Sequence, residues 1–113
     1  MKKIVFPGSF DPITRGHYNI IKRALPVFDE IIIGIGINSE KKYLFPIEKR
    51  ENWIRELYKA EKKISVLRYE GLTIDFCKKA GADYILRGVR SAADFEFERG
   101  IAQMNQAMSG IDT

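Results

Sequence analysis

The residues that could do chemistry begin in the stretch from Phe6 to His17, which reads Phe-Pro-Gly-Ser-Phe-Asp-Pro-Ile-Thr-Arg-Gly-His. Its two prolines and two glycines exclude a regular helix or strand, so we expect a loop of defined shape. Ser9 and Thr14 offer hydroxyl groups, and His17 stands at the start of an amphipathic run. The free N–H groups at the start of a helix attract anions. The stretch therefore predicts a phosphate-binding loop with a histidine directed into it.

A simpler alternative is an ordinary turn between a strand and a helix, in which Asp11 or Thr14 caps the helix and His17 lies on its surface. Asp11 is also the only candidate for a general base near the loop, and we expect it to be a structural cap instead. The joint presence of Pro-Gly-Ser-Phe-Asp-Pro and Thr-x-Gly-His, directly after an apolar run, favours the phosphate-binding hypothesis.

Strand and helix patterns alternate along the chain. Short runs of apolar and β-branched residues predict strands, and amphipathic runs predict helices between them. The expected strands span 3–6, 30–37, 64–69 and 84–86, and the expected helices span 17–25, 46–60, 73–80 and 92–108. The alternation predicts an α/β fold of Rossmann-like type: a doubly wound parallel sheet in three α/β/α layers, forming a single domain over residues 1–113.

Such a sheet binds ligands beyond the carboxyl ends of its strands. Ser9 follows the first expected strand, Lys41 the second and Thr73 the third, and Arg87 and Arg90 follow the fourth. These side chains should therefore meet at one edge of the sheet, where they supply donors and cations for phosphate chemistry.

The cations among them have structural alternatives. Lys41 fits a solvated loop, since exposed lysines are common. Arg87 and Arg90 fit ion pairs with Asp94 or Glu96, since arginine also serves such pairs.

Local signals add detail to the expected elements. Gly34 and Gly36, inside the second strand, predict that another group approaches its backbone closely. Thr73 is expected to cap its helix, and Gly81 to end it. The inner face of helix 46–60 is expected to carry Trp53, Ile54 and Leu57.

Composition and charge argue against several classes of protein. Of the 113 residues, 45% are hydrophobic and 30% charged, as in an ordinary globular domain. The 19 Lys and Arg exceed the 15 Asp and Glu only mildly, and the interspersed signs argue against a nucleic-acid partner. The only Cys, Cys77, is expected in the core, and a single His and Cys argue against a protein-built metal site. With no visible signal peptide, and no apolar run longer than Ile31 to Ile37, we expect a cytoplasmic protein and no membrane partner.

The stretch from Phe6 to His17 resembles the nucleotidyltransferase superfamily that carries the (His/Thr)-x-Gly-His signature. A second block, Leu86 to Glu96 (Leu-Arg-Gly-Val-Arg-Ser-Ala-Ala-Asp-Phe-Glu), is similar to bacterial phosphopantetheine adenylyltransferases, and the resemblance runs from about Lys3 to about Met108. It implies reversible adenylyl transfer from ATP, carried with Mg²⁺, to 4′-phosphopantetheine. The products are dephospho-coenzyme A and pyrophosphate in coenzyme A synthesis, and coenzyme A is a candidate feedback ligand.

The resemblance also implies roles for single residues. His17 matches the histidine that stabilises the transition state, and Lys41 the lysine that neutralises the reacting phosphate. Ser9 stands where the family commonly has a threonine whose hydroxyl bridges both substrates. The implied ATP contacts are Ser9, Phe10, His17, Gly88, Val89, Arg90 and Glu98. The implied phosphopantetheine contacts are Ser9, Lys41, Thr73 and Arg87. For Glu98, a surface pair with a neighbour one helical turn away is the alternative.

Helix 92–108 carries more apolar surface than one core stripe needs. Burial within the monomer is one explanation, and the resemblance implies another, subunit contact in a homohexamer, which we favour. The residues concerned are Phe95, Phe97, Ile101, Met104 and Met108.

Family members continue past this helix into another strand and a Ser-rich motif that binds the ATP phosphates. Nothing of that kind follows Gly110, so we expect a domain that is C-terminally incomplete relative to the family, without a packed tail after the helix. A non-catalytic nucleotide-binding or assembly module, and a related transferase with another acceptor, are the alternative functions.

Overall fold

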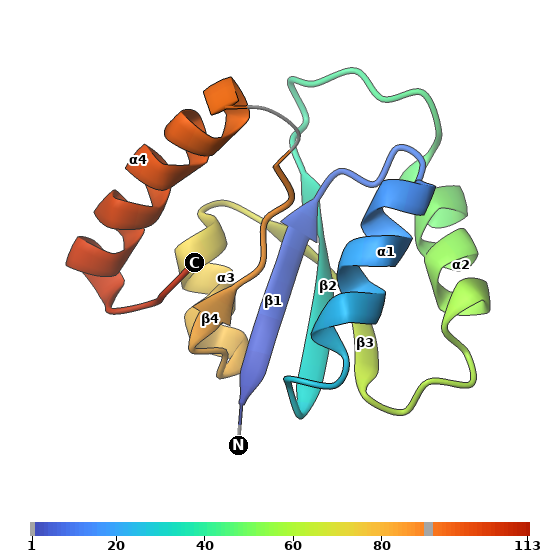
Figure 1. Ribbon diagram of the computed structural model, residues 1–113. Coiled ribbons are helices and arrows are strands. Elements are labelled where there is room, and N and C mark those ends of the chain that lie inside the picture. Colours follow the sequence, from blue (N-terminus) through green and yellow to red (C-terminus); the bar gives the residue numbers. More distant parts are fainter. Residues whose placement is uncertain (1, 90–91) are drawn as a thin grey trace.

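The computed structural model describes residues 2–89 and 92–113. Within these residues, four strands alternate with four helices (Figure 1). They are β1 (Lys3–Gly8), α1 (Arg15–Ala24), β2 (Glu30–Ile37), α2 (Ile47–Leu57), β3 (Ile64–Glu70), α3 (Thr73–Ala80), β4 (Tyr84–Ile85) and α4 (Ala92–Ser109). The strands pair in parallel in the order β3-β2-β1-β4.

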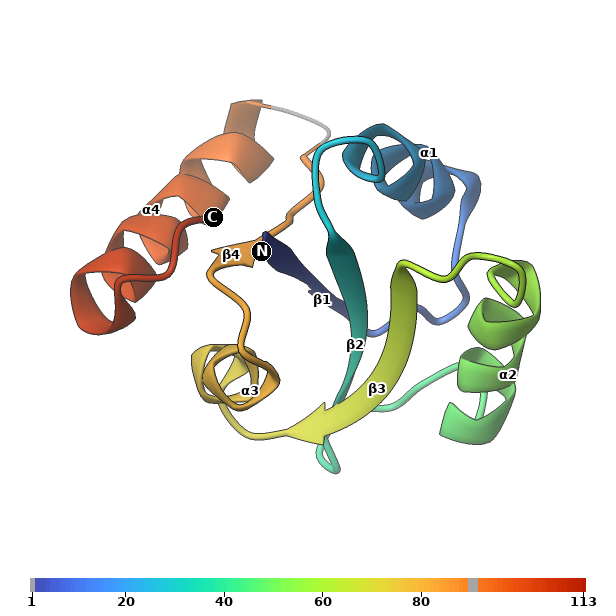
Figure 2. The same ribbon diagram turned by 90° about the horizontal axis from the view of Figure 1, so that it is seen from below.

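Helices cover both faces of this sheet. In Figure 2, α1 and α2 lie on one side, and α3 and α4 on the other. Alternate residues of β1 point to opposite layers, because successive side chains of a strand face opposite ways: Ile4 and Phe6 join the core under α1 and α2, and Val5 joins the core under α3. The predicted doubly wound, three-layer α/β/α arrangement is confirmed.

The glycines of β2 make room for the protein's own aromatic side chains. A Cβ atom at Gly34 would lie 2.7 Å from the ring of Phe76 and 3.2 Å from that of Tyr69, and one at Gly36 would also meet Tyr69. Tyr69 and Phe76 stack with their centroids 4.4 Å apart. The predicted close approach is confirmed, and the approaching group is a stack that joins β3 to α3.

Helix α2 turns a different face inward from the one expected. Trp53 and Leu57 are exposed, and only Ile54 of the expected stripe is buried. The buried residues recur at every fourth position, as Arg50, Ile54 and Tyr58. Trp53 instead packs edge-on against Phe45 outside the core. The sequence did not predict this face, because the apolar residues of the helix form two neighbouring stripes and only the docking of the helix shows which one is buried.

Two expectations about helix ends are wrong. Leu72, not Thr73, is the N-cap residue of α3, and the Thr73 hydroxyl lies 2.9 Å from that of Tyr69 instead.

After α4, Gly110 adopts a positive φ of 76°, Ile111 is buried in the core under α3, and Ile85 donates its N–H to the Asp112 carbonyl at 2.7 Å. The residues after α4 are therefore packed, because Ile111 reaches that core. The expected end of α3 at Gly81 is confirmed, with φ 74°.

Cys77 is a core residue, as predicted. Burial raises the pKa of its thiol to about 11, so the thiol stays protonated at neutral pH and is not a nucleophile. No helix in the described ranges is long and apolar enough to cross a membrane.

Candidate active site

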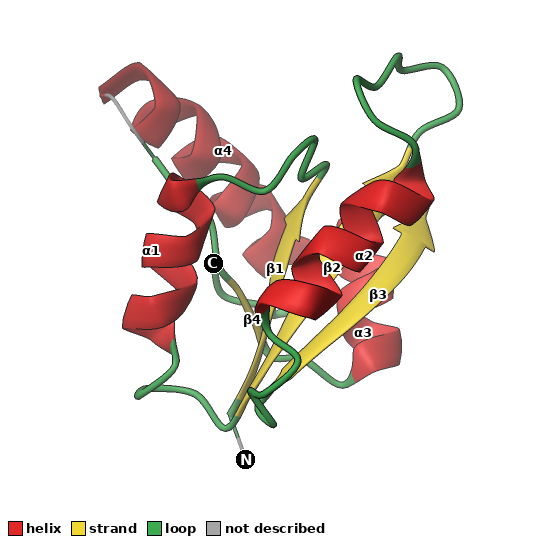
Figure 3. Cartoon of the chain, turned by 90° about the vertical axis from the view of Figure 1, so that its right-hand side faces the viewer, coloured by secondary structure: helices red, strands yellow, loops and turns green. Residues whose placement is uncertain are grey.

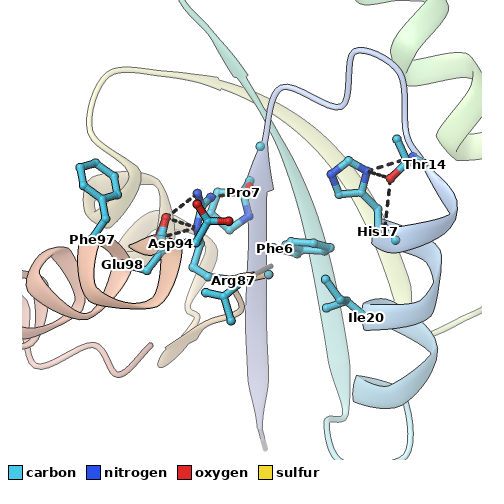
Figure 4. Close-up of a pocket in the computed structure, with 13 residues that line it drawn as sticks. Phe6, Pro7, Thr14, His17, Ile20, Arg87, Asp94, Phe97 and Glu98 are labelled. Atoms are coloured by element: carbon cyan, nitrogen blue, oxygen red, sulfur yellow. Dashed lines mark hydrogen bonds and ion pairs between the residues drawn. The ribbon is translucent and has the colours of Figure 1, made fainter. Parts of the chain in front are cut away.

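The loops that follow β1, β2 and β4 gather at the carboxyl edge of the sheet (Figure 3). The first of them, residues 9–14, ends in a reciprocal cap of α1. Thr14 is the N-cap residue, and its Oγ1 accepts the His17 N–H at 3.3 Å. In return, Nδ1 of His17 accepts the Thr14 N–H at 2.9 Å (Figure 4). Since a backbone N–H can only donate, Nδ1 presents its lone pair, and the single proton of the neutral ring sits on Nε2.

Two phenylalanines hold the His17 ring. Its centroid lies 4.9 Å from that of Phe10 and 5.9 Å from that of Phe6. Burial lowers the pKa of His17 below its ordinary value of 6.5, which favours the neutral ring at neutral pH. Thr14 therefore caps α1, as one alternative predicted, while the half-buried His17 keeps an N–H donor beside the helix N-terminus.

A cavity of about 520 Å³ adjoins this histidine. It lies between the end of β1, the start of α1, the segment after β4 and the first half of α4 (Figure 4). The predicted site residues that line it are His17, Arg87, Gly88, Val89 and Glu98. Arg90 lies outside the described residues. Asp94 and Phe97 also line the cavity, although neither was predicted as a site residue. The position of Asp94, one helical turn before Glu98, could have indicated it.

Gly88 brings the segment after β4 close to α1. A Cβ atom at Gly88 would lie 2.5 Å from Cδ1 of Ile20, a residue of α1 that also lines the cavity. A residue larger than glycine would therefore force the Ile20 side chain to move.

Arg87 and Glu98 form an ion pair across the cavity. Nε and Nη2 of Arg87 donate to the Glu98 carboxylate at 2.9 to 3.2 Å, and Nη1 donates to the Pro7 carbonyl at 3.0 Å. Arg87 therefore forms an ion pair, as its structural alternative predicted, but the acceptor is Glu98, whereas that alternative named Asp94 or Glu96. The alternative for Glu98, a partner one turn away on its own helix, is wrong, because β4 brings Arg87 within reach.

Ser9 and Lys41 meet beside the cavity, although neither lines it. Lys41 Nζ donates to Ser9 Oγ at 3.1 Å, across a separation of 32 residues in the sequence. Phe10 is only 2% exposed as a whole residue and has a positive φ of 48°, so its ring packs in the core beside His17. Asp11 accepts the N–H groups of Leu44 and Phe45. It is structural, as expected, but it anchors the loop after β2 and does not cap α1.

Comparison with known proteins gives this site its context. The sequence model of the family described as cytidylyltransferase-like matches residues 5–110. The phosphopantetheine adenylyltransferase of Flavobacterium psychrophilum is 61% identical over 113 residues, which cover all of this chain and 75% of that protein. The protein of the same name from Bacteroides thetaiotaomicron is 54% identical over the same shares of the two chains. This chain belongs to the phosphopantetheine adenylyltransferases of the cytidylyltransferase-like family.

A more distant structure shares the fold alone. The crystal structure of the lipopolysaccharide core biosynthesis protein from Thermoplasma volcanium superposes with a TM-score of 0.70 at 21% identity, and the match covers all of this chain and 92% of that one.

The adenylyltransferase fold has a second, smaller cavity of about 190 Å³ next to the first. Thr73, Ile101 and Asn105 line it, and Arg87 and Glu98 line both cavities. Thr73 and Arg87, which the sequence predicts as contacts of the same substrate, therefore share a cavity, whereas Lys41 lines neither of the two cavities. Among the described residues, no group of three or more His, Cys, Asp or Glu could hold a metal ion.

Proposed function

We propose that this chain transfers the adenylyl group of ATP to 4′-phosphopantetheine and releases pyrophosphate and dephospho-coenzyme A. The observation that carries this proposal is the cavity where the His17 donor faces the Arg87–Val89 segment, at the carboxyl ends of β1 and β4. The 61% identity to a phosphopantetheine adenylyltransferase supports the acceptor.

In the proposed reaction, an oxygen of the 4′-phosphate attacks the α-phosphorus of ATP. A new P–O bond forms, the bond from the α-phosphorus to the bridging oxygen breaks, and pyrophosphate leaves with the electron pair. A phosphate acceptor needs no general base, so the protein has to position the reactants and stabilise charge. Asp11, whose carboxylate is engaged by two backbone N–H groups, is not needed as a base.

His17 is suited to stabilise the charge that builds up on the α-phosphate. Its neutral ring offers the Nε2 proton, and the N-terminus of α1 adds a favourable dipole at the same place. Because the Thr14 N–H occupies Nδ1, the ring is already oriented before substrate binds. Lys41, with Ser9 as its hydrogen-bond partner, would supply positive charge on the acceptor side.

The two cavities suggest where each substrate lies. We assign the larger cavity to ATP, with Gly88, Val89 and Glu98, and the smaller one to the pantetheine arm, with Thr73. Arg87 lines both, so its guanidinium is suited to meet the phosphate at their junction. A phosphate there would compete with Glu98 for the guanidinium, while the Pro7 carbonyl continues to hold Nη1.

Further properties belong to the same proposal. Mg²⁺ would enter with the ATP phosphates as part of the substrate, coenzyme A would act as a feedback ligand, and the enzyme would work in the cytoplasm. Assembly into a homohexamer is supported by the apolar surface of α4, a helix in which no residue is buried. The large apolar side chains that α4 exposes are Phe95, Phe97, Ile101, Met104 and Met108, of which Phe97 and Ile101 also line the two cavities.

Pyrophosphate release from this chain with ATP, Mg²⁺ and 4′-phosphopantetheine tests the proposal. Unphosphorylated pantetheine and nicotinamide mononucleotide serve as control acceptors. We expect turnover with 4′-phosphopantetheine alone. Turnover with nicotinamide mononucleotide but not with 4′-phosphopantetheine would assign a different acceptor.

A further inference from the structure

Arg50 is a buried cation whose guanidinium meets backbone carbonyls and an aromatic ring. Its side chain belongs to the inner face of α2, and the residue is 3% exposed. Across residues 2–89 and 92–113, no aspartate or glutamate forms a hydrogen bond or ion pair with its guanidinium. Its Nε donates to the Phe45 carbonyl at 2.9 Å, its Nη1 donates to the Ser9 carbonyl at 2.8 Å, and its Cζ lies 4.2 Å from the Tyr43 ring centroid. Burial of a charge is costly, so these contacts have to be retained.

These contacts join the two loops that carry Ser9 and Lys41. Ser9 belongs to the loop after β1, while Phe45 and Tyr43 belong to the loop after β2. Arg50 therefore links the loop after β1 to the loop after β2 through hydrogen bonds to one carbonyl in each loop. The Asp11 carboxylate, which accepts the Phe45 N–H at 2.8 Å, ties the same loops from the other side.

Lys41 depends on both ends of this bridge. Its Nζ donates to Ser9 Oγ at 3.1 Å and lies 5.6 Å from the centroid of the same Tyr43 ring that stacks on Arg50. Arg50 thus holds Ser9 by its carbonyl, Lys41 meets Ser9 at its hydroxyl, and Tyr43 lies against both cations.

We propose that Arg50 is a positioning residue for adenylyl transfer, which fixes Ser9 Oγ and Lys41 Nζ at the working distance by clamping the two loops together. The inference rests on the proposed function, because it needs Lys41 and Ser9 to act on the substrates. Only arginine suits the position, since its planar fork reaches two carbonyls in fixed directions while its ring-facing surface stacks on Tyr43. A lysine ammonium keeps the charge but is a point donor.

The test is a cycle of substitutions read by kcat/KM for pyrophosphate release. Arg50→Lys keeps the charge and most of the volume. We expect it to lower kcat/KM by roughly 10- to 100-fold, the range that a misplacement of about 1 Å produces. In a chain that already carries Ser9→Ala and Lys41→Ala, the same substitution should change kcat/KM by less than about 3-fold, because the groups it positions are gone.

Arg55→Lys is the matched control, because Arg55 lies on the same helix and bonds Glu51 and the Val66 carbonyl, away from both loops. It should leave kcat/KM unchanged. Asp11→Asn is the second test variant, since it weakens the same loop contact from outside the core and remains decisive if Arg50→Lys does not fold.

Three results bear against the inference. An equal loss from Arg50→Lys in both backgrounds would show a merely structural role. Native kcat/KM in the folded Arg50→Lys chain, or in Asp11→Asn where Arg50→Lys does not fold, would also overturn it. Native activity of Lys41→Ala alone would instead refute the role proposed for Lys41, and the inference with it. If the chain binds 4′-phosphopantetheine and ATP without turnover, the same cycle read by calorimetric Kd gives the same decision.

Discussion

Substitution of His17 by glutamine separates two tasks of one side chain. Nδ1 completes the cap of α1 by accepting the Thr14 N–H, and the Nε2 proton is the proposed donor to the reacting phosphate. Glutamine at this helix position is a standard capping-box residue, because its side-chain oxygen can accept the same N–H. His17→Gln should therefore keep the helix start and lose the catalytic donor, whereas His17→Ala should lose both.

The sizes of the two effects can be worked out from the contacts. Removal of one oriented donor from developing charge costs about 10²- to 10³-fold in kcat, or about 3–4 kcal/mol of activation free energy. The cap contributes less: Thr14 is exposed, so water can replace the lost acceptor, and we assign it about 0.5–1 kcal/mol of folding stability. For a domain of this size that corresponds to a shift of about 2–6 °C in Tm.

The assay combines steady-state kinetics with thermal unfolding of the native chain and both variants. We expect both variants to lose kcat by similar factors, with the KM for ATP changed less than about 3-fold, because the contact strengthens in the transition state. Both variants lose the ring contacts with Phe6 and Phe10, so His17→Ala, which also loses the cap, should show the larger fall in Tm. Native kcat in His17→Gln, or a rise in KM that equals the fall in kcat, would refute the reasoning.

Three further outcomes are expected. Acidification from about pH 7.5 to about pH 5 should lower the urea midpoint of the native chain. Part of this fall comes from His17: its pKa is lowered in the folded state, so the unfolded chain binds more protons as the pH falls through 6.5. The urea midpoint of His17→Gln should fall less, and an equal fall in both proteins contradicts this. Gly34→Ala should destabilise the fold by about 1–3 kcal/mol, since the new methyl meets the Phe76 ring, whereas Gly100→Ala, with open space around it, should not; equal urea midpoints for the two variants argue against the stack as the cause. Met104→Glu should dissociate the proposed assembly in light scattering, and an unchanged mass would remove α4 from the interface.

The sequence by itself determined most of the elements and the edge of the sheet at which the candidate site lies. The bounds expected for β2 and α3 match the structure, because a β-branched apolar run and an amphipathic run ended by glycine are local signals. The Thr-x-Gly-His motif likewise placed His17 in the first turn of α1, where the cap and the helix N-terminus act within a few residues. The alternation of elements then implied a parallel sheet and the edge at which the site lies.

Only the tertiary structure decided which of these residues touch and what holds them there. Arg50 lies in a polar stretch of α2, and its burial depends on the docking of that helix against two loops. One of these loops carries Ser9, which is 41 residues from Arg50 in the sequence. The same holds for two other contacts. Arg87 finds Glu98 because the segment after β4 lies beside α4, and Ile111 is buried because the segment after α4 packs against β4. Such contacts depend on strand register and helix rotation, which set distances of a few ångströms between distant segments. Composition and periodicity indicate which face is apolar, but they do not specify its partner.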